Sequence, residues 1–111
     1  MATKFIPVTD TKDLEQVLAR SHDAPVLLFK HSLTCPISAS AYREMEQAQT
    51  EVALVVVQKA RTVSQEVAER TGIRHESPQA LVLRKGEVVW SASHWKVTAD
   101  AVNAAMKGGE K

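Results

Sequence analysis

Residues 25–47, PVLLFKHSLTCPISASAYREMEQ, constrain the fold more than any other part of the chain. Val26–Phe29 is apolar on both faces, as expected of a central strand that helices cover on each side. We predict a polar loop over Lys30–Leu33, then a helix with Cys35 as its first residue and the residue before it as the cap. Pro36 fits the first turn because its missing N–H would have no partner there. The stretch therefore predicts a strand, a loop and a helix that begins at the only cysteine of the chain.

The rest of the chain alternates between short apolar runs and segments with helical periodicity. The predicted strands cover residues 5–8, 26–29, 52–57, 80–83 and 87–90. The predicted helices are 11–20 with a cap at Asp10 or Thr11, the helix from residue 34, a helix opened by a capping box at Thr62–Gln65 and ended by Gly72, and 98–106. The order β-α-β-α-β-α-β-β-α belongs to the α/β class. It indicates a thioredoxin-like fold, a central mixed β-sheet flanked by helices.

The overall composition narrows the class of partner. Lys plus Arg is 14 and Asp plus Glu is 13, so the net charge of +1 gives no reason to expect nucleic acid or an acidic membrane. A length of 111 residues suits a single domain over residues 1–111. The first ten residues lack the apolar run of a signal peptide, so we expect a cytoplasmic protein. The four histidines show no metal-ligand spacing with the single cysteine, and we predict no metal site.

The chemistry of the chain is predicted to depend on Cys35. A lone cysteine is usually a small buried hydrophobic residue. The start of a helix, however, presents unpaired N–H groups and the positive end of the helix dipole. Both favour the thiolate, which is the nucleophilic form of cysteine. We therefore assign Cys35 as a catalytic nucleophile.

The residues after the cysteine indicate how it would react. The string from Cys35 to Ser38 has the frame of a C-x-x-C redox motif with serine in place of the second cysteine. Serine cannot close an internal disulfide, so a mixed disulfide on Cys35 must be resolved by an outside thiol. Ser38 is either a hydrogen-bond donor to the sulfur or an ordinary residue of the first helical turn, and the sequence leaves both open.

Further candidates surround the cysteine. Lys30 and His31 in the predicted loop, and Lys59 after the third strand, are candidates for stabilising the thiolate or binding a small thiol; each is equally consistent with a solvated charge. Ser77-Pro78 precedes a strand, and Pro78 is consistent with an ordinary trans proline at a strand start. In the thioredoxin fold, however, a proline here is cis and lies beside the active cysteine, and on that resemblance alone we favour cis. The backbone before it can then pair with an extended substrate. We assign six residues as the setting of Cys35: Thr34, Pro36, Ile37, Ser38, Ser77 and Pro78.

Four groups of residues together carry a resemblance to a known family: Leu27-Leu28-Phe29, Thr34-Cys35-Pro36-Ile37-Ser38, Ser77-Pro78 and the hairpin Arg84-Lys85-Gly86-Glu87. The chain resembles the monothiol bacilliredoxins, thioredoxin-like proteins of bacteria that use bacillithiol, in which TCPIS is the typical active-site string. The resemblance covers nearly the whole chain. The strand before the cysteine and the cysteine motif also resemble those of glutaredoxins, although the loop before the cysteine is differently built.

The resemblance implies a reaction. The Cys35 thiolate would attack the bacillithiol sulfur of an S-bacillithiolated client protein, release the client thiol and keep the bacillithiol. A second bacillithiol would free Cys35, and a flavin-dependent bacillithiol disulfide reductase would reduce the product. Bacillithiol would thus be a co-substrate, with no bound cofactor.

Two other functions remain open from the sequence. A monothiol glutaredoxin-like protein could bind an iron–sulfur cluster between two subunits, although that family usually has Gly-Phe-Ser after its cysteine, where this chain has Pro36-Ile37-Ser38. A non-catalytic adaptor could bind partners along the proline loop and would not need Cys35.

Overall fold

The computed structural model describes residues 5–108. Its strands are β1 (Phe5–Pro7), β2 (Val26–His31), β3 (Val52–Val56), β4 (Gln79–Arg84) and β5 (Glu87–Ser93). Its helices are α1 (Thr11–Arg20), α2 (Pro36–Glu46), α3 (Arg61–Thr71) and α4 (Ala99–Gly108), with a short 3-10 helix, η1 (His94–Lys96), before α4. This order confirms the predicted succession of strands and helices and adds η1 to it.

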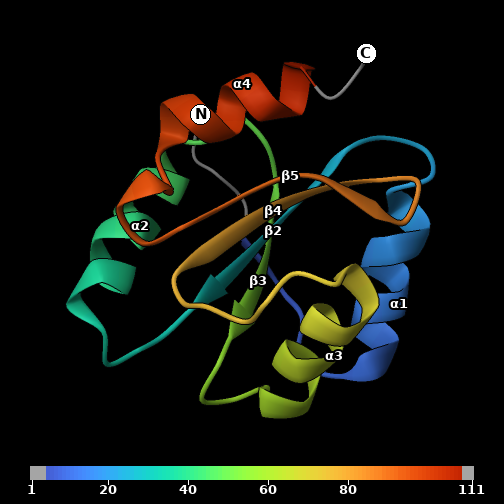
Figure 1. Ribbon diagram of the computed structural model, residues 1–111, viewed down its shortest axis with the longest axis horizontal. Coiled ribbons are helices and arrows are strands. Elements are labelled where there is room, and N and C mark those ends of the chain that lie inside the picture. Colours follow the sequence, from blue (N-terminus) through green and yellow to red (C-terminus); the bar gives the residue numbers. More distant parts are fainter. Residues whose placement is uncertain (1–4, 109–111) are drawn as a thin grey trace.

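The five strands form one mixed sheet in the order β1-β3-β2-β4-β5 (Figure 1). β2 runs parallel to β3 and antiparallel to β4, and β5 is antiparallel to β4. β1 pairs parallel with β3 at the other edge, where Pro7 is tolerated because an edge strand does not need every donor. The carboxyl ends of β2, β3 and β5 therefore meet the amino end of β4 at one end of the sheet.

Helices cover both faces of the sheet. α1 and α3 lie on one face, and α2 and α4 lie on the other (Figure 1). Because side chains of a strand alternate between faces, Leu28 of β2 packs with Val63 and Val67 on the α1–α3 side. Its neighbour Phe29 packs with Met45 on the α2–α4 side. A central strand that is apolar on both faces, as predicted, is what these two cores require.

Two predicted helix signals are confirmed and one is wrong. The Asp10 side chain caps α1 by accepting a hydrogen bond from the Asp13 N–H at 2.8 Å. Gly72 ends α3 with a φ of 73°, which is the left-handed conformation that glycine adopts without strain. The capping box at Thr62–Gln65 is wrong, because α3 begins one residue before it and Ala60 occupies the N-cap position with no side-chain cap.

Strand ends were less well predicted than strand centres. β2 continues through Lys30 and His31, so the loop predicted over Lys30–Leu33 is wrong in its first half. Pairing explains the extension, because Lys30 is in register with Val55 on one side and Gln79 on the other. Both strands of the hairpin are also longer than predicted. No helix within residues 5–108 is long and apolar enough to cross a membrane.

Candidate functional site

Cys35 lies between the end of β2 and the start of α2. It occupies the N-cap position with φ −100° and ψ 122°, and Pro36 is the first helical residue. The prediction that Thr34 caps the helix and that Cys35 is its first residue is therefore wrong by one position. Proline explains the difference, because it disfavours the helical region for the residue before it. The sulfur nevertheless stands at the amino end of α2, and Cys35 is a half-buried free thiol.

The surroundings of the sulfur favour its ionised form. Hydrogen bonds from the Ser38 backbone, the Ile37 backbone and the Ser38 side chain lower the pKa of Cys35, the first of these most strongly, while desolvation partly opposes them. Each of these donors belongs to the first turn of α2, where N–H groups have no partner within the helix. The arrangement therefore favours the thiolate, the nucleophilic form of the side chain.

Ser38 connects the helix to the loop before the cysteine. Its side chain is fully buried, and its Oγ accepts a hydrogen bond from the Ser32 N–H at 3.2 Å. It therefore has the first of the two roles left open by the sequence, since its hydroxyl also contributes to lowering the pKa of Cys35. One side chain thus holds the loop and assists the sulfur.

Gln58, just after β3, also holds this loop and was missed by the sequence prediction. Its Nε2 donates to Ser32 Oγ at 2.9 Å and to Thr34 Oγ1 at 3.4 Å, and its Oε1 accepts from the Leu33 N–H at 3.0 Å. The signal that could have found it is its place directly after a central parallel strand, at the end of the sheet where α/β folds place ligand sites.

The Ser77-Pro78 peptide bond is cis, which confirms the expectation from the resemblance. Pro78 is buried, and its carbonyl accepts a hydrogen bond from the His94 N–H at 2.9 Å. Within residues 5–108, the backbone N–H and C=O of Ser77 have no backbone hydrogen-bond partner. Since β4 starts where β2 ends, the Ser77-Pro78 segment and the loop that carries Cys35 lie at the same end of the sheet.

The three candidate cations occupy different environments. Lys30 and His31 are strand residues and are buried, not solvated loop residues. His31 lies against the ring of Tyr42, with ring centroids 5.0 Å apart, and burial lowers the pKa of its imidazole, so it favours the neutral form. Lys59 is exposed in the turn after β3, next to Gln58. Among the three, Lys59 is thus the exposed cation at the Cys35 end of the sheet.

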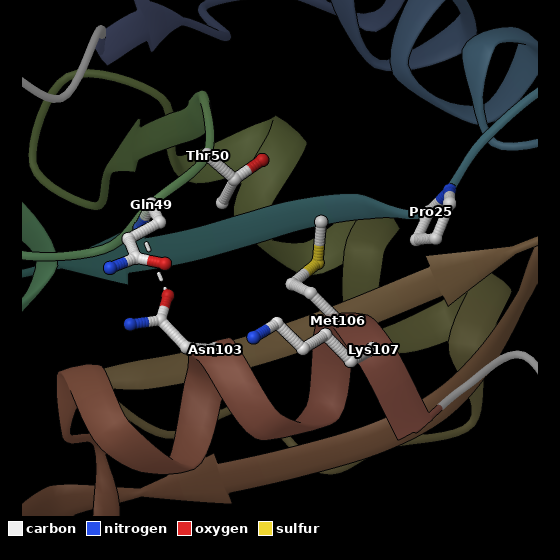
Figure 2. Close-up of a pocket in the computed structure, with 6 residues that line it drawn as sticks. All are labelled: Pro25, Gln49, Thr50, Asn103, Met106 and Lys107. Carbon is white, nitrogen blue, oxygen red and sulfur yellow. Dashed lines mark hydrogen bonds between the residues drawn. The ribbon is translucent and has the colours of Figure 1, made fainter.

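A pocket of about 410 Å³ lies at the opposite end of the sheet (Figure 2). It is lined by Pro25, Gln49, Thr50, Asn103, Met106 and Lys107. Pro25 comes just before β2, whereas Cys35 follows it, so the strand separates the two places. The Asn103 side chain closes one wall by accepting a hydrogen bond from the Gln49 N–H at 2.9 Å. None of the residues predicted for the site lines this pocket.

Comparisons with known proteins agree with this geometry. A family model described as monothiol bacilliredoxin BrxC matches residues 6–102. A solved structure described as an oxidoreductase with a thioredoxin fold is 32% identical, with a TM-score of 0.84 over 91% of this chain and 92% of that chain.

More distant structures confirm the thioredoxin-like fold alone. The thioredoxin of Malassezia sympodialis is 16% identical, with a TM-score of 0.73 over 97% of this chain and 91% of its own. Chloroplast thioredoxin f from spinach is 21% identical, with a TM-score of 0.69 over 99% of this chain and 96% of its own.

Proposed function

The chain belongs to the monothiol bacilliredoxin family, and from this premise we propose that it removes bacillithiol from S-bacillithiolated client proteins through a mixed disulfide on Cys35. That the chain is a thiol–disulfide oxidoreductase follows from the family and from its 32% identical relative. One observation supports the finer role above others. The sulfur at the amino end of α2 has donors that stabilise its thiolate, and serine stands where a resolving cysteine would be.

The proposed reaction has two exchanges. The Cys35 thiolate attacks the bacillithiol sulfur of the client disulfide, a Cys35–bacillithiol disulfide forms, and the client leaves as a thiolate that takes a proton from water. The thiolate of a second bacillithiol then attacks the bacillithiol sulfur on Cys35 and releases the Cys35 thiolate. The client cysteine is reduced and one free bacillithiol is oxidised, which ends in a disulfide with the bacillithiol that came from the client. A separate flavin-dependent reductase would return that disulfide to bacillithiol.

The setting residues have distinct parts in this proposal. Ser38 and the Ile37 N–H stabilise the leaving thiolate of Cys35 in the second exchange, as they stabilise the attacking thiolate in the first. The free backbone of Ser77 pairs with the client as an added strand would. Lys59 is an exposed cation at this end of the sheet and is available to a carboxylate of the small thiol. The reducing cytoplasm is the compartment we propose, because free thiols persist there.

Intact-mass spectrometry tests the proposal. Incubation with a bacillithiolated client should transfer one bacillithiol to the wild-type protein and leave the client as a free thiol. A Cys35→Ser variant should leave the client capped, and a Ser40→Ala variant should behave as wild type. Transfer by Cys35→Ser, or a wild-type protein that never acquires the adduct, would refute the role.

A further inference from the structure

Lys30 is a buried cation in the centre of the sheet. It is 0% exposed and pairs on both sides, with Val55 of β3 and Gln79 of β4. Lysine is almost never fully buried unless it is paired. The partner here is an imidazole, because the Lys30 Nζ lies 3.1 Å from His75 Nδ1, and within residues 5–108 no salt bridge to Lys30 is present.

His75 connects this lysine to the segment that precedes β4. It lies three residues before Pro78 and is exposed overall, but its Nδ1 points inward. The same Nδ1 is 3.2 Å from the Oγ of Ser64, a buried residue in the first turns of α3. The Lys30 ammonium can only donate, so Nδ1 is the acceptor and the ring is neutral. His75 therefore attaches residues 74–78, which we call the proline loop, to β2 and to α3.

Other contacts fix the opposite side of the proline loop. The Pro78 carbonyl accepts from His94, and the Glu76 carboxylate lies 3.8 Å from His94 Nδ1. On the Lys30 side, Gln79 Nε2 donates to the Arg74 carbonyl at 2.9 Å, since Gln79 is the register partner of Lys30 and their side chains share a face. The loop is thus held by η1 on one side and by Lys30 and Ser64 on the other, with the free backbone of Ser77 between them.

Placing a lysine at this buried position is expected to reduce the stability of the folded protein. Burial lowers the pKa of Lys30 to about 8, which shows that the fold disfavours its charged form. Taking a charged group out of water costs free energy unless it is paired with an opposite charge and hydrogen-bonded. A methionine would fill the same space without an ammonium that needs partners. The benefit of lysine must therefore lie elsewhere than in stability, and its hydrogen bond to the proline loop is what it adds.

We propose that Lys30, acting through His75, is a positioning residue that holds the proline loop in the shape that pairs with the extended backbone of a client. The inference rests on the proposed function in one respect, that clients pair with the Ser77 backbone. It predicts a loss specific to peptide substrates. A small disulfide that reaches only Cys35 does not use the loop backbone and should be indifferent to it.

The test compares two substrates in single-turnover formation of the Cys35 adduct. One is a short peptide disulfide-linked to bacillithiol, and the other is bacillithiol disulfide. We expect Lys30→Met and His75→Leu to raise the peptide concentration that gives half the maximal rate and to lower the second-order rate constant of adduct formation by about tenfold, since small misplacements of a binding group are felt strongly. Exchange with the small disulfide should change by less than about twofold. His75→Asn, which keeps an acceptor near the Nδ1 position, should recover most of the loss.

Two controls separate positioning from folding. Lys12→Met removes an exposed lysine of α1 and should match wild type on both substrates. The pH profile of Cys35 alkylation should be the same in every variant, because neither Lys30 nor His75 contributes to lowering the pKa of Cys35. His75 is a surface residue, so its variants decide the matter even if Lys30→Met folds poorly.

The outcomes are distinct. A peptide-specific loss with rescue by His75→Asn supports the proposal. An equal loss on both substrates, or no loss on the peptide, overturns it. If wild type fails with bacillithiol, the proposed function is wrong, and the same comparison is made with the peptide capped by cysteine and with cystine.

Discussion

At the residue scale, the Ser38 side chain accepts a hydrogen bond from the Ser32 N–H and helps to lower the pKa of Cys35. Removing its hydroxyl should show how much of the lowered pKa comes from the side chain and how much from the backbone N–H groups. Ser38→Ala removes a hydroxyl that lowers the pKa of Cys35, but it leaves the two N–H donors of α2 in place. We expect the pKa of Cys35 to rise and its alkylation near neutral pH to slow by about fivefold, since a net hydrogen bond contributes on the order of 1 kcal/mol. The measurement is the rate of iodoacetamide labelling against pH.

Ser40→Ala is the matched control, because Ser40 lies in the same helix beyond its first turn. An unchanged profile in Ser38→Ala would mean that the backbone alone stabilises the thiolate. A slower rate in the control as well would point to a general disturbance of α2.

Gln58 acts on the three residues before the cysteine. In Gln58→Ala the Leu33 N–H loses its acceptor, and the Ser32 and Thr34 hydroxyls lose a donor. We expect amide hydrogen exchange at Leu33 to accelerate by about fivefold, which corresponds to a net hydrogen bond of on the order of 1 kcal/mol. Amide exchange followed by NMR measures this directly.

Gln65→Ala removes an exposed glutamine from α3 and should leave the Leu33 exchange rate unchanged. Equal rates in Gln58→Ala and wild type would show that the loop holds its shape without this side chain.

At the scale of the secondary-structure elements, the residues at the amino end of α2 decide whether a mixed disulfide on Cys35 is resolved inside the protein or by an outside thiol. Ser38 and Cys35 already interact through the first turn, so Ser38→Cys restores a C-x-x-C pair in which the second sulfur can reach the first. We expect this variant to form an internal disulfide on oxidation and not to accumulate a bacillithiol adduct, because the new thiol attacks the mixed disulfide. Intact mass distinguishes the two products.

Ser40→Cys adds a thiol in the same helix outside the first turn and should still accumulate the adduct. A lasting adduct on Ser38→Cys would mean that the buried position prevents the second sulfur from reaching Cys35.

The elements themselves were largely readable from the sequence, because each depends on local signals. Apolar runs predicted the central strands, and Asp10 and Gly72 predicted helix ends. The errors lie where distant residues decide. Lys30 and His31 look like loop residues, yet ladder pairing and packing against other segments make them strand residues. The cap at Thr62 was a valid local signal that α3 does not use.

Residues of the candidate site could be predicted from the sequence only where they belong to a short motif. Cys35, Ser38 and Pro78 are recognisable from short strings, and the structure places their loops at one end of the sheet. Gln58 and His75 could not be found this way. Their importance comes from partners 11 to 45 positions away along the chain, and such pairs leave no periodic or local signal.

At the scale of the whole molecule, four of the loops at one end of the sheet together form one surface. The loops after β2, β3 and β5 and the loop before β4 carry Cys35, Gln58, His94 and Pro78 respectively. Polar side chains join them to one another and to the strands beneath. Lys30 is one of three buried polar residues in the strands of residues 5–108, with His31 and Gln79, and its charge gives the stability of the whole molecule a testable pH dependence.

Lys30 has a pKa lowered by burial to about 8 from 10.5. Between these values the unfolded chain binds more protons than the folded chain, so the free energy of unfolding should rise with pH across this window. At pH values below this window, the lowered pKa of Lys30 reduces the free energy of unfolding by on the order of 3 kcal/mol relative to a lysine with an ordinary pKa. Lys30→Met has no such group and should lack this rise.

Urea denaturation of wild type and Lys30→Met near pH 7 and near pH 10 makes the comparison, because the difference between the two proteins cancels the titrating groups that do not interact with Lys30. His75 is the neighbour that does interact, since burial and the charge of Lys30 both lower the pKa of its imidazole. We expect Lys30→Met to be as stable as wild type or more stable near neutral pH, and wild type to recover at the higher pH. Lys12→Met, which removes an exposed lysine, should follow the wild-type profile. Parallel profiles for wild type and Lys30→Met would mean that the folded protein leaves this ammonium with an ordinary pKa. The argument that the lysine is retained for the proline loop at the expense of stability would then fail.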